Sequence, residues 1–124
     1  MSKKLSLIMK SQICYNERNK ATFHVECKKA LRNLAKAMGL DKWQYDLSVN
    51  KGGIAVSGEV TLHTEKVYVQ VSEPLAGSGS EILFRSCNGR KDYSGGQNRF
   101  APVEALESLE NFAEAVTNVG NSGR

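Results

Sequence analysis

The strongest constraint on the fold is a succession of three segments in which apolar and polar residues alternate. Residues 43–49, 54–62 and 67–71 each place apolar side chains at every second position. Because successive side chains of a strand point to opposite faces, this period of two predicts strands with one buried and one polar face. Two short polar connections, 50–53 with Asn and Gly and 63–66 with the sequence HTEK, separate the strands, which indicates an antiparallel meander. A fourth strand is expected at 82–87.

Two other segments show the spacing of three and four residues that is typical of helices. In residues 22–38 this spacing predicts one apolar stripe, with Thr22 as the N-cap and Gly39 as the residue that ends the helix. A second helix is expected from Pro102, whose missing N–H costs little in a first turn, to Gly120. The apolar stripes are Phe23, Cys27, Ala30, Leu31, Leu34 and Met38 in the first helix and Val103, Leu106, Leu109, Ala113 and Val116 in the second.

Together these elements predict an α+β fold, with a single antiparallel sheet of four to five strands, a meander core, and two helices packed on one face. The predicted order is (β)-α-β-β-β-β-α, where the first strand is expected within residues 4–15. A length of 124 residues suits one domain, so we expect 1–120 to fold as a unit and 121–124 to form a mobile tail.

The cysteines and the apolar runs bear on the compartment. Cys14, Cys27 and Cys87 are odd in number and no pair has a CxxC spacing, which argues against a disulfide framework and a zinc site. Reduced cysteines are typical of the cytoplasm. No apolar run has the length of a signal-peptide core or of a membrane span, so we expect a cytoplasmic protein without a membrane partner.

No combination of residues predicts a catalytic site. Cys87 is a candidate nucleophile at a strand end, but no spacing ties His24 or His63 to it as a base, and a small apolar residue of the sheet is the preferred interpretation. The histidines, expected at a helix start and in a turn, lack further ligands at metal-binding spacing. The glycine-rich stretch 77–80 leads into a strand, unlike a phosphate-binding loop. We therefore expect a non-enzymatic protein without catalytic residues, cofactor or metal.

The net charge of +4 is unevenly distributed along the chain. Residues 1–42 hold ten Lys/Arg and three Asp/Glu, whereas residues 101–124 hold one Arg and four Glu. A basic first third suits polyanions such as nucleic acid. Two arrangements of the oppositely charged helices remain open: they attract each other side by side, or they turn outward and offer complementary patches for a homo-oligomer. The charged faces are Lys28, Lys29, Arg32 and Lys36 on the first helix and Glu107, Glu110 and Glu114 on the second.

The segment 84–102, FRSCNGRKDYSGGQNRFAP, is the candidate binding site. Its glycines allow positive φ, so successive N–H groups can point into one concavity, and the segment leads into a helix N-terminus that favours anions. Arginine grips phosphate with two parallel hydrogen bonds, and Tyr93 and Phe100 offer flat faces on which a base can stack. The predicted ligand-binding residues are Arg85, Asn88, Arg90, Lys91, Tyr93, Gln97, Asn98 and Arg99, with Lys28, Lys29, Arg32 and Lys36 as a secondary basic face.

Two interpretations of the segment remain open. As a site, it predicts a phosphate-bearing ligand, either a nucleotide or nucleic acid. As structure alone, its Asn-Gly and Gly-Gly pairs are ordinary turn sequences, and its arginines are solvated charges. The alternative function is a protein-interaction module of a phage or mobile element that inhibits a host or defence enzyme, with Arg and Tyr as interface anchors. In size and style the chain is similar to small accessory proteins of phages and plasmids.

Overall fold

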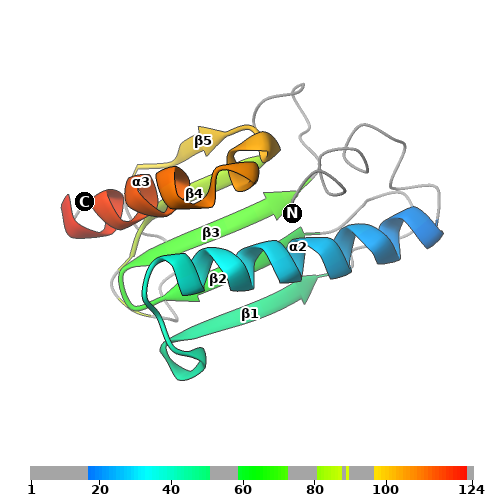
Figure 1. Cartoon of the computed structure of the whole chain (residues 1–124), viewed down its shortest axis with the longest axis horizontal. Coiled ribbons are helices and arrows are strands. Elements are labelled where there is room, and N and C mark those ends of the chain that lie inside the picture. Colours follow the sequence, from blue (N-terminus) through cyan, green and yellow to red (C-terminus); the bar gives the residue numbers. More distant parts are fainter. Residues whose placement is uncertain (1–16, 51–58, 73–80, 88, 90–96, 123–124) are drawn as a thin grey trace.

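The computed structural model describes residues 17–50, 59–72, 81–87, 89 and 97–122. The described strands form one antiparallel sheet in which neighbours in sequence are neighbours in space, and both long helices lie on one face of it (Figure 1). The predicted α+β fold is confirmed. The elements in chain order are α2 (Glu17–Ala37), a first 3₁₀ turn (Lys42–Gln44), β1 (Tyr45–Asn50), β2 (Glu59–Thr64), β3 (Val67–Ser72), β4 (Ile82–Ser86), β5 (Arg99–Ala101), a second 3₁₀ turn (Val103–Glu107) and α3 (Leu109–Ser122).

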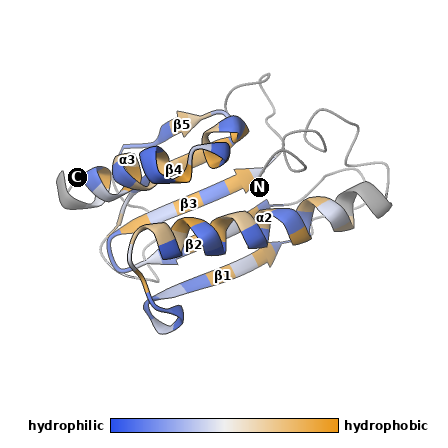
Figure 2. Ribbon diagram, viewed as in Figure 1, coloured by the Kyte–Doolittle hydropathy of each residue, from blue (hydrophilic) through white to orange (hydrophobic). Residues whose placement is uncertain are grey.

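The alternation of the sequence places one set of side chains between the sheet and the helices. Figure 2 shows apolar and polar residues alternating along β2 and β3. In β2, β3 and β4 the alternate residues that face α2 and α3 are almost completely buried, whereas those of the edge strands β1 and β5 are half-buried or exposed. The stripes of both helices pack against them. We call this side of the sheet the helix face. Its strand residues in the core are Val60, Leu62, Val67, Val69, Val71, Ile82 and Phe84.

Helix α2 ends as its sequence predicts and begins earlier than predicted. Gly39 has a φ of 81°, which an L side chain adopts only with strain. The N–H of Gly39 donates to the Lys36 carbonyl and that of Leu40 donates to the Ala35 carbonyl, each at 3.0 Å, which is the bonding pattern of a Schellman cap. The helix starts at Glu17, so Thr22 lies within it and the predicted N-cap is wrong.

The meander differs from the prediction at its ends. Strand β1 starts at Tyr45, and Trp43 belongs to the first 3₁₀ turn, where the Asp41 N–H donates to Gln44 Oε1 at 2.8 Å. Strand β2 continues through His63 and Thr64, which were expected in a turn. Two local hydrogen bonds explain the change. Thr64 Oγ1 accepts from the Lys66 N–H at 3.1 Å and from the Val67 N–H at 3.0 Å, and these bonds close a turn that is shorter than predicted.

The C-terminal third contains a strand that the sequence did not predict. Strand β5, inside the candidate segment, pairs with β4, and no periodicity marks its three residues. The final helical region is divided into a 3₁₀ turn after Pro102 and α3, and Glu81 Oε1 accepts from the Val103 N–H at 3.0 Å. Gly120 does not end α3, which includes Asn121 and Ser122 of the expected tail. The strand expected at 4–15 lies outside the described residues.

Candidate functional site

The opposite face of the sheet carries a row of polar and aromatic side chains at equivalent positions of four strands. The register pairs Asp46 with His63, His63 with Tyr68, and Tyr68 with Arg85. Residues paired directly across antiparallel strands point to the same side of a sheet. None of the four belongs to the core between sheet and helices, since each alternates with core residues of its strand. We define the opposite face as Asp46, Ser48, Thr61, His63, Tyr68, Gln70, Leu83, Arg85 and Phe100.

Arg85 is the most unusual member of this row because its charged side chain is buried. Only 7% of the residue is exposed, and its guanidinium carbon lies 4.3 Å from the centroid of the Tyr68 ring. The Tyr68 ring is held in turn, since its hydroxyl donates to Gln70 Oε1 at 3.0 Å and the ring meets the His63 ring in a T-shaped arrangement at a centroid distance of 5.2 Å. The cation is therefore positioned by a fixed aromatic surface.

The energetics of this arrangement concern the charge on Arg85. Taking a charge out of water costs several kcal/mol, whereas a cation–π contact contributes about 0.5–2 kcal/mol. Among the residues that the structure describes, no carboxylate lies within ion-pair distance of the Arg85 guanidinium. The donors of a guanidinium form a planar fork that matches phosphate or carboxylate. An anion bound at Arg85 would compensate the positive charge of the guanidinium, which no carboxylate of the described residues does.

An exposed aromatic ring lies beside Arg85 on the same face. The register pairs Leu83 of β4 with Phe100 of β5, so Phe100 is a diagonal neighbour of Arg85 across the two strands. Phe100 is 58% exposed, an unusual position for a large apolar ring. The Arg85 guanidinium lies over Tyr68 of β3, so Phe100 offers a stacking surface on the same face, on the other side of β4 from that guanidinium.

The structure separates two arginines that the sequence placed in one site. Arg99 pairs with Phe84 in the β4–β5 register and therefore points to the helix face, while Arg85 points to the opposite face. Gln97 and Asn98 are exposed just before β5. The remaining predicted ligand residues lie outside the described part of the chain, so their role stays a prediction. They are Asn88, Arg90, Lys91 and Tyr93.

Tyr68, which contacts Arg85, and His63, which contacts Tyr68, are members of this row that the sequence did not identify. The strand assignment of Tyr68 follows from alternation, because Tyr68 lies in a segment that was correctly predicted as a strand. The cross-strand register that brings Tyr68 opposite Arg85 was not predicted. His63 was expected in a turn and is instead buried in β2, and His24 is also buried, beside Phe23.

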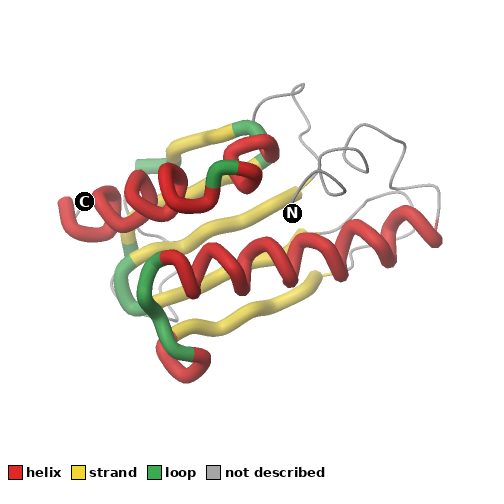
Figure 3. Tube along the Cα trace, viewed as in Figure 1, coloured by secondary structure: helices red, strands yellow, loops and turns green. Residues whose placement is uncertain are grey.

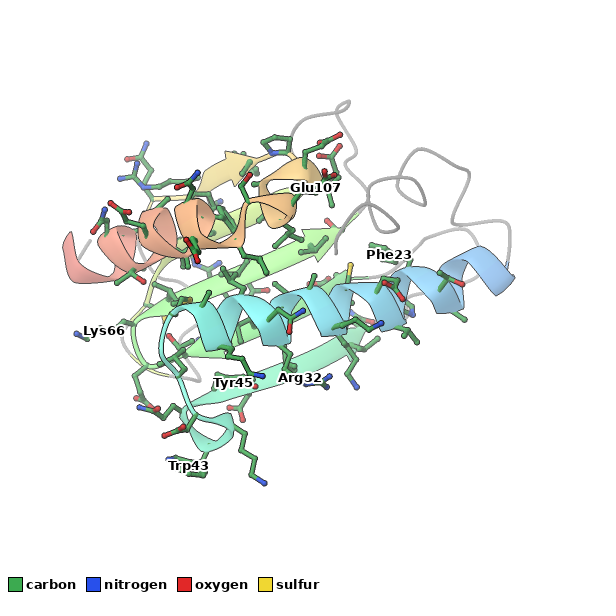
Figure 4. The ribbon with its side chains drawn as sticks, in the orientation of Figure 1. Phe23, Arg32, Trp43, Tyr45, Lys66 and Glu107 are labelled. Carbon is green, nitrogen blue, oxygen red and sulfur yellow. The ribbon has the colours of Figure 1, made fainter. Side chains whose placement is uncertain are left out.

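The secondary basic face on α2 is present but does not adjoin Arg85. Lys29, Arg32 and Lys36 are exposed and Lys28 is half-buried, on a helix that covers the other side of the sheet. Figure 4 shows Arg32 on α2, in front of the sheet. Lys29 Nζ lies 3.7 Å from Glu26 Oε2 of its own helix. A small ligand at Arg85 is therefore out of reach of these charges.

The two oppositely charged helices lie side by side and run in the same direction (Figure 3). Within the described residues, the basic side chains of α2 form no ion pair with the glutamates of α3. Glu107, Glu110 and Glu114 are exposed. Charges of opposite sign thus face outward on neighbouring helices, and self-association through them stays a prediction.

The described cysteines do not have the environment of catalytic thiols. Cys87 is buried, and its Sγ lies 3.3 Å from the Thr64 carbonyl oxygen, to which it donates. Burial, with a smaller contribution from the charge of Glu26, raises the pKa of the Cys27 thiol far above its ordinary value. A raised pKa leaves less of the reactive thiolate at neutral pH. The described part of the chain also holds no group of His, Cys, Asp or Glu residues that could bind a metal ion.

We expect Cys27 and Cys87 to be unreactive in the folded protein. In a Cys14→Ser variant, modification by a disulfide reagent at pH 8 should be at least about 100-fold slower in native buffer than in urea, because the thiols react only after local opening. The measurement is the rate of thiolate release, with mass spectrometry to locate the modified residue. Fast modification of Cys87 in native buffer would show an accessible thiol and contradict the structural interpretation.

No helix in the described ranges has the length and apolar character that a membrane crossing requires.

Comparisons with known proteins add no family assignment. No protein-family model matches the sequence, and neither the curated proteins nor the solved structures contain a match.

Proposed function

We propose that this protein is a non-enzymatic binding protein that holds a phosphate-bearing ligand, a nucleotide or nucleic acid, with Arg85 as its principal phosphate contact. The observation that carries the proposal is the burial of the Arg85 guanidinium against Tyr68 without a carboxylate from the described residues. A buried cation is costly unless an anion compensates it. Phosphate is well suited because its oxygens accept two parallel N–H bonds from one guanidinium.

The aromatic neighbour favours a nucleotide over inorganic phosphate. Phe100 exposes its ring on the face that holds Arg85. Stacking of a base on an aromatic side chain contributes about 1–3 kcal/mol and tolerates any base. Arg85 would hold the phosphate and Phe100 the base, with the residues predicted between positions 88 and 98 adding donors around them.

The position of the basic residues distinguishes the two ligand classes. Lys29, Arg32 and Lys36 lie on α2, across the sheet from Arg85, and Arg99 projects to that side too. A mononucleotide at Arg85 contacts none of them, whereas a polymer passing over the edge of the sheet reaches both sides. Release of counterions from several phosphates makes polymer binding strongly dependent on salt.

Native mass spectrometry of protein purified from cells is the first test, because it reports a retained ligand and the subunit count together. Fluorescence anisotropy should follow, with a labelled adenine nucleotide and a labelled oligonucleotide at about 50 and 200 mM salt. Polymer binding should weaken by orders of magnitude over this range, and nucleotide binding far less. The proposal fails if no ligand is retained and neither probe binds at the lower salt concentration.

The second candidate function is a protein-interaction module. Two large aromatic side chains favour it, because Trp43 and Phe100 are 68% and 58% exposed and aromatic residues are enriched in interface hot spots. Capture from cell extract with and without nuclease separates the two candidates. A specific partner that is retained after nuclease treatment and lost in a Phe100→Ala variant supports the protein interface.

A further inference from the structure

A second concave site lies on the helix side of the molecule, at the end where α2 and α3 both terminate. It has a volume of about 500 Å³, within the range of small-molecule pockets. Figure 4 shows two of its residues, Trp43 on the first 3₁₀ turn and Lys66 on the β2–β3 turn, at this same end. The lining residues are Met38, Leu40, Trp43, Gln44, Thr64, Glu65, Lys66, Val67, Thr117 and Gly120.

The walls of this pocket are held by separate local interactions. The cap at Gly39 turns the chain from α2 toward Leu40 and Trp43. The β2–β3 turn is closed by Thr64 Oγ1 and tied to the residue that follows β4, since the Cys87 N–H donates to the Lys66 carbonyl at 2.8 Å. A preformed pocket of this kind does not lose binding energy to ordering of its walls.

Helix α3 forms the third wall of the pocket, and Gly120 sets how closely this helix approaches β3. A Cβ atom at this position would lie only 2.6 Å from Val67 Cγ1, so glycine allows α3 to pack directly on the start of β3. The helix and the turn therefore meet at the floor of the pocket, and Thr117, one turn earlier in α3, reaches its wall.

The chemistry of the lining defines a ligand class. Met38, Leu40 and Val67 are apolar, and the lining also includes Trp43, which is 68% exposed. The two charges in the lining, on Glu65 and Lys66, are adjacent in sequence and opposite in sign, so the pocket has no net formal charge. Hydrogen-bonding capacity is supplied by uncharged groups, the Thr117 hydroxyl and the side-chain NH₂ of Gln44, whose oxygen already accepts from the Asp41 N–H.

We infer that this pocket binds a compact, uncharged aromatic molecule that carries a hydrogen-bonding group on its edge. The ring lies against Trp43 and the apolar residues, because flat apolar surfaces gain most from contact with an indole. The polar edge faces Gln44 and Thr117. A charged ligand gains little, since the field of Glu65 opposes that of Lys66 while the charge still loses water. The site is independent of Arg85, which projects from the opposite face of the sheet.

The single tryptophan of the chain makes the inference directly testable. The ¹H–¹⁵N spectrum contains one indole N–H cross-peak, which belongs to Trp43 and reports occupancy of the pocket. Benzamide, benzoate and benzylammonium form a matched set of neutral, anionic and cationic probes, to be titrated at constant ionic strength. Benzamide should shift the Trp43 cross-peak saturably with a dissociation constant of roughly millimolar order, and each ion should bind at least about threefold more weakly.

Variants locate the binding event. Thr117→Phe fills the pocket and should weaken benzamide binding at least about tenfold, whereas Val25→Ala, an exposed change elsewhere on α2, should leave it unchanged. If Thr117→Phe fails to fold, Trp43→Ala, followed by saturation transfer to benzamide, should show at least about a fivefold loss. The inference is overturned by an unsaturable or absent Trp43 shift, by tighter binding of either ion, or by binding that survives these substitutions.

Discussion

Replacing Arg85 with Met should weaken binding of a phosphate-bearing ligand at least about 30-fold, because truncating one partner of a buried charge contact costs about 2–5 kcal/mol. Met preserves the unbranched apolar stem of the side chain and removes the guanidinium. Since the structure describes no carboxylate partner for Arg85, the change leaves no buried anion unpaired within the described residues. The free energy of unfolding should therefore be unchanged or increased, because buried ions are often replaced by apolar residues without loss.

Arg99→Ala is the matched control for this prediction. It removes the same charge from the neighbouring strand, but Arg99 is exposed and points to the other side of the sheet. We expect less than about a fivefold loss of affinity, as for other exposed charges. Anisotropy titrations and urea denaturation of both variants separate binding from folding. Equal losses for the two variants would assign binding to the arginine-rich segment as a whole, and no loss for Arg85→Met would exclude the opposite face.

Phe112→Ala should lower the free energy of unfolding by about 3–5 kcal/mol. The Phe112 ring is 6% exposed and meets the Phe84 ring edge-on at a centroid distance of 5.3 Å, which joins α3 to β4. Removing it leaves a cavity between helix and sheet and deletes an aromatic pair. The loss is a large part of the 5–15 kcal/mol that stabilises a typical domain.

Phe100→Ala makes the identical chemical change on the opposite side of the sheet. Because Phe100 is largely exposed, we expect its stability to change by less than about 1 kcal/mol. Urea denaturation at equal protein concentration measures both variants. Comparable losses would mean that Phe100 is buried in solution, as by self-association, and would remove it as an exposed stacking surface. A small loss for Phe112 would contradict the packing of α3 on β4.

The elements that were predicted correctly are those whose signal lies within a few neighbouring residues. The alternation at 67–71 specifies β3, and Gly39 marks the end of α2 because few other residues tolerate its conformation. Strand β5 was missed for the converse reason. Its three residues have no periodicity of their own, and they form a strand because β4 supplies their hydrogen-bond partners.

The candidate site shows the same limit. The sequence identified Arg85 and Arg99 as cations of one segment. Composition alone does not show which face of the sheet each side chain occupies. Whether two residues share a face depends on strand boundaries, and a shift of one residue reverses the face. Only the β4–β5 register shows that these two arginines diverge and that Phe100 shares the face of Arg85. Tyr68 becomes relevant only because β3 lies beside β4.

Local pattern was therefore sufficient for the architecture of this chain, since burial of one apolar face per strand or helix dictates a sheet covered by two helices. It was also sufficient for the kinds of chemistry available, because residue types are read directly. The placement of that chemistry was decided by tertiary structure. Pairing across strands brings Arg85 onto Tyr68, and the shared end of α2 and α3 forms the Trp43 pocket. Both depend on contacts between residues far apart in the chain, which no local pattern encodes.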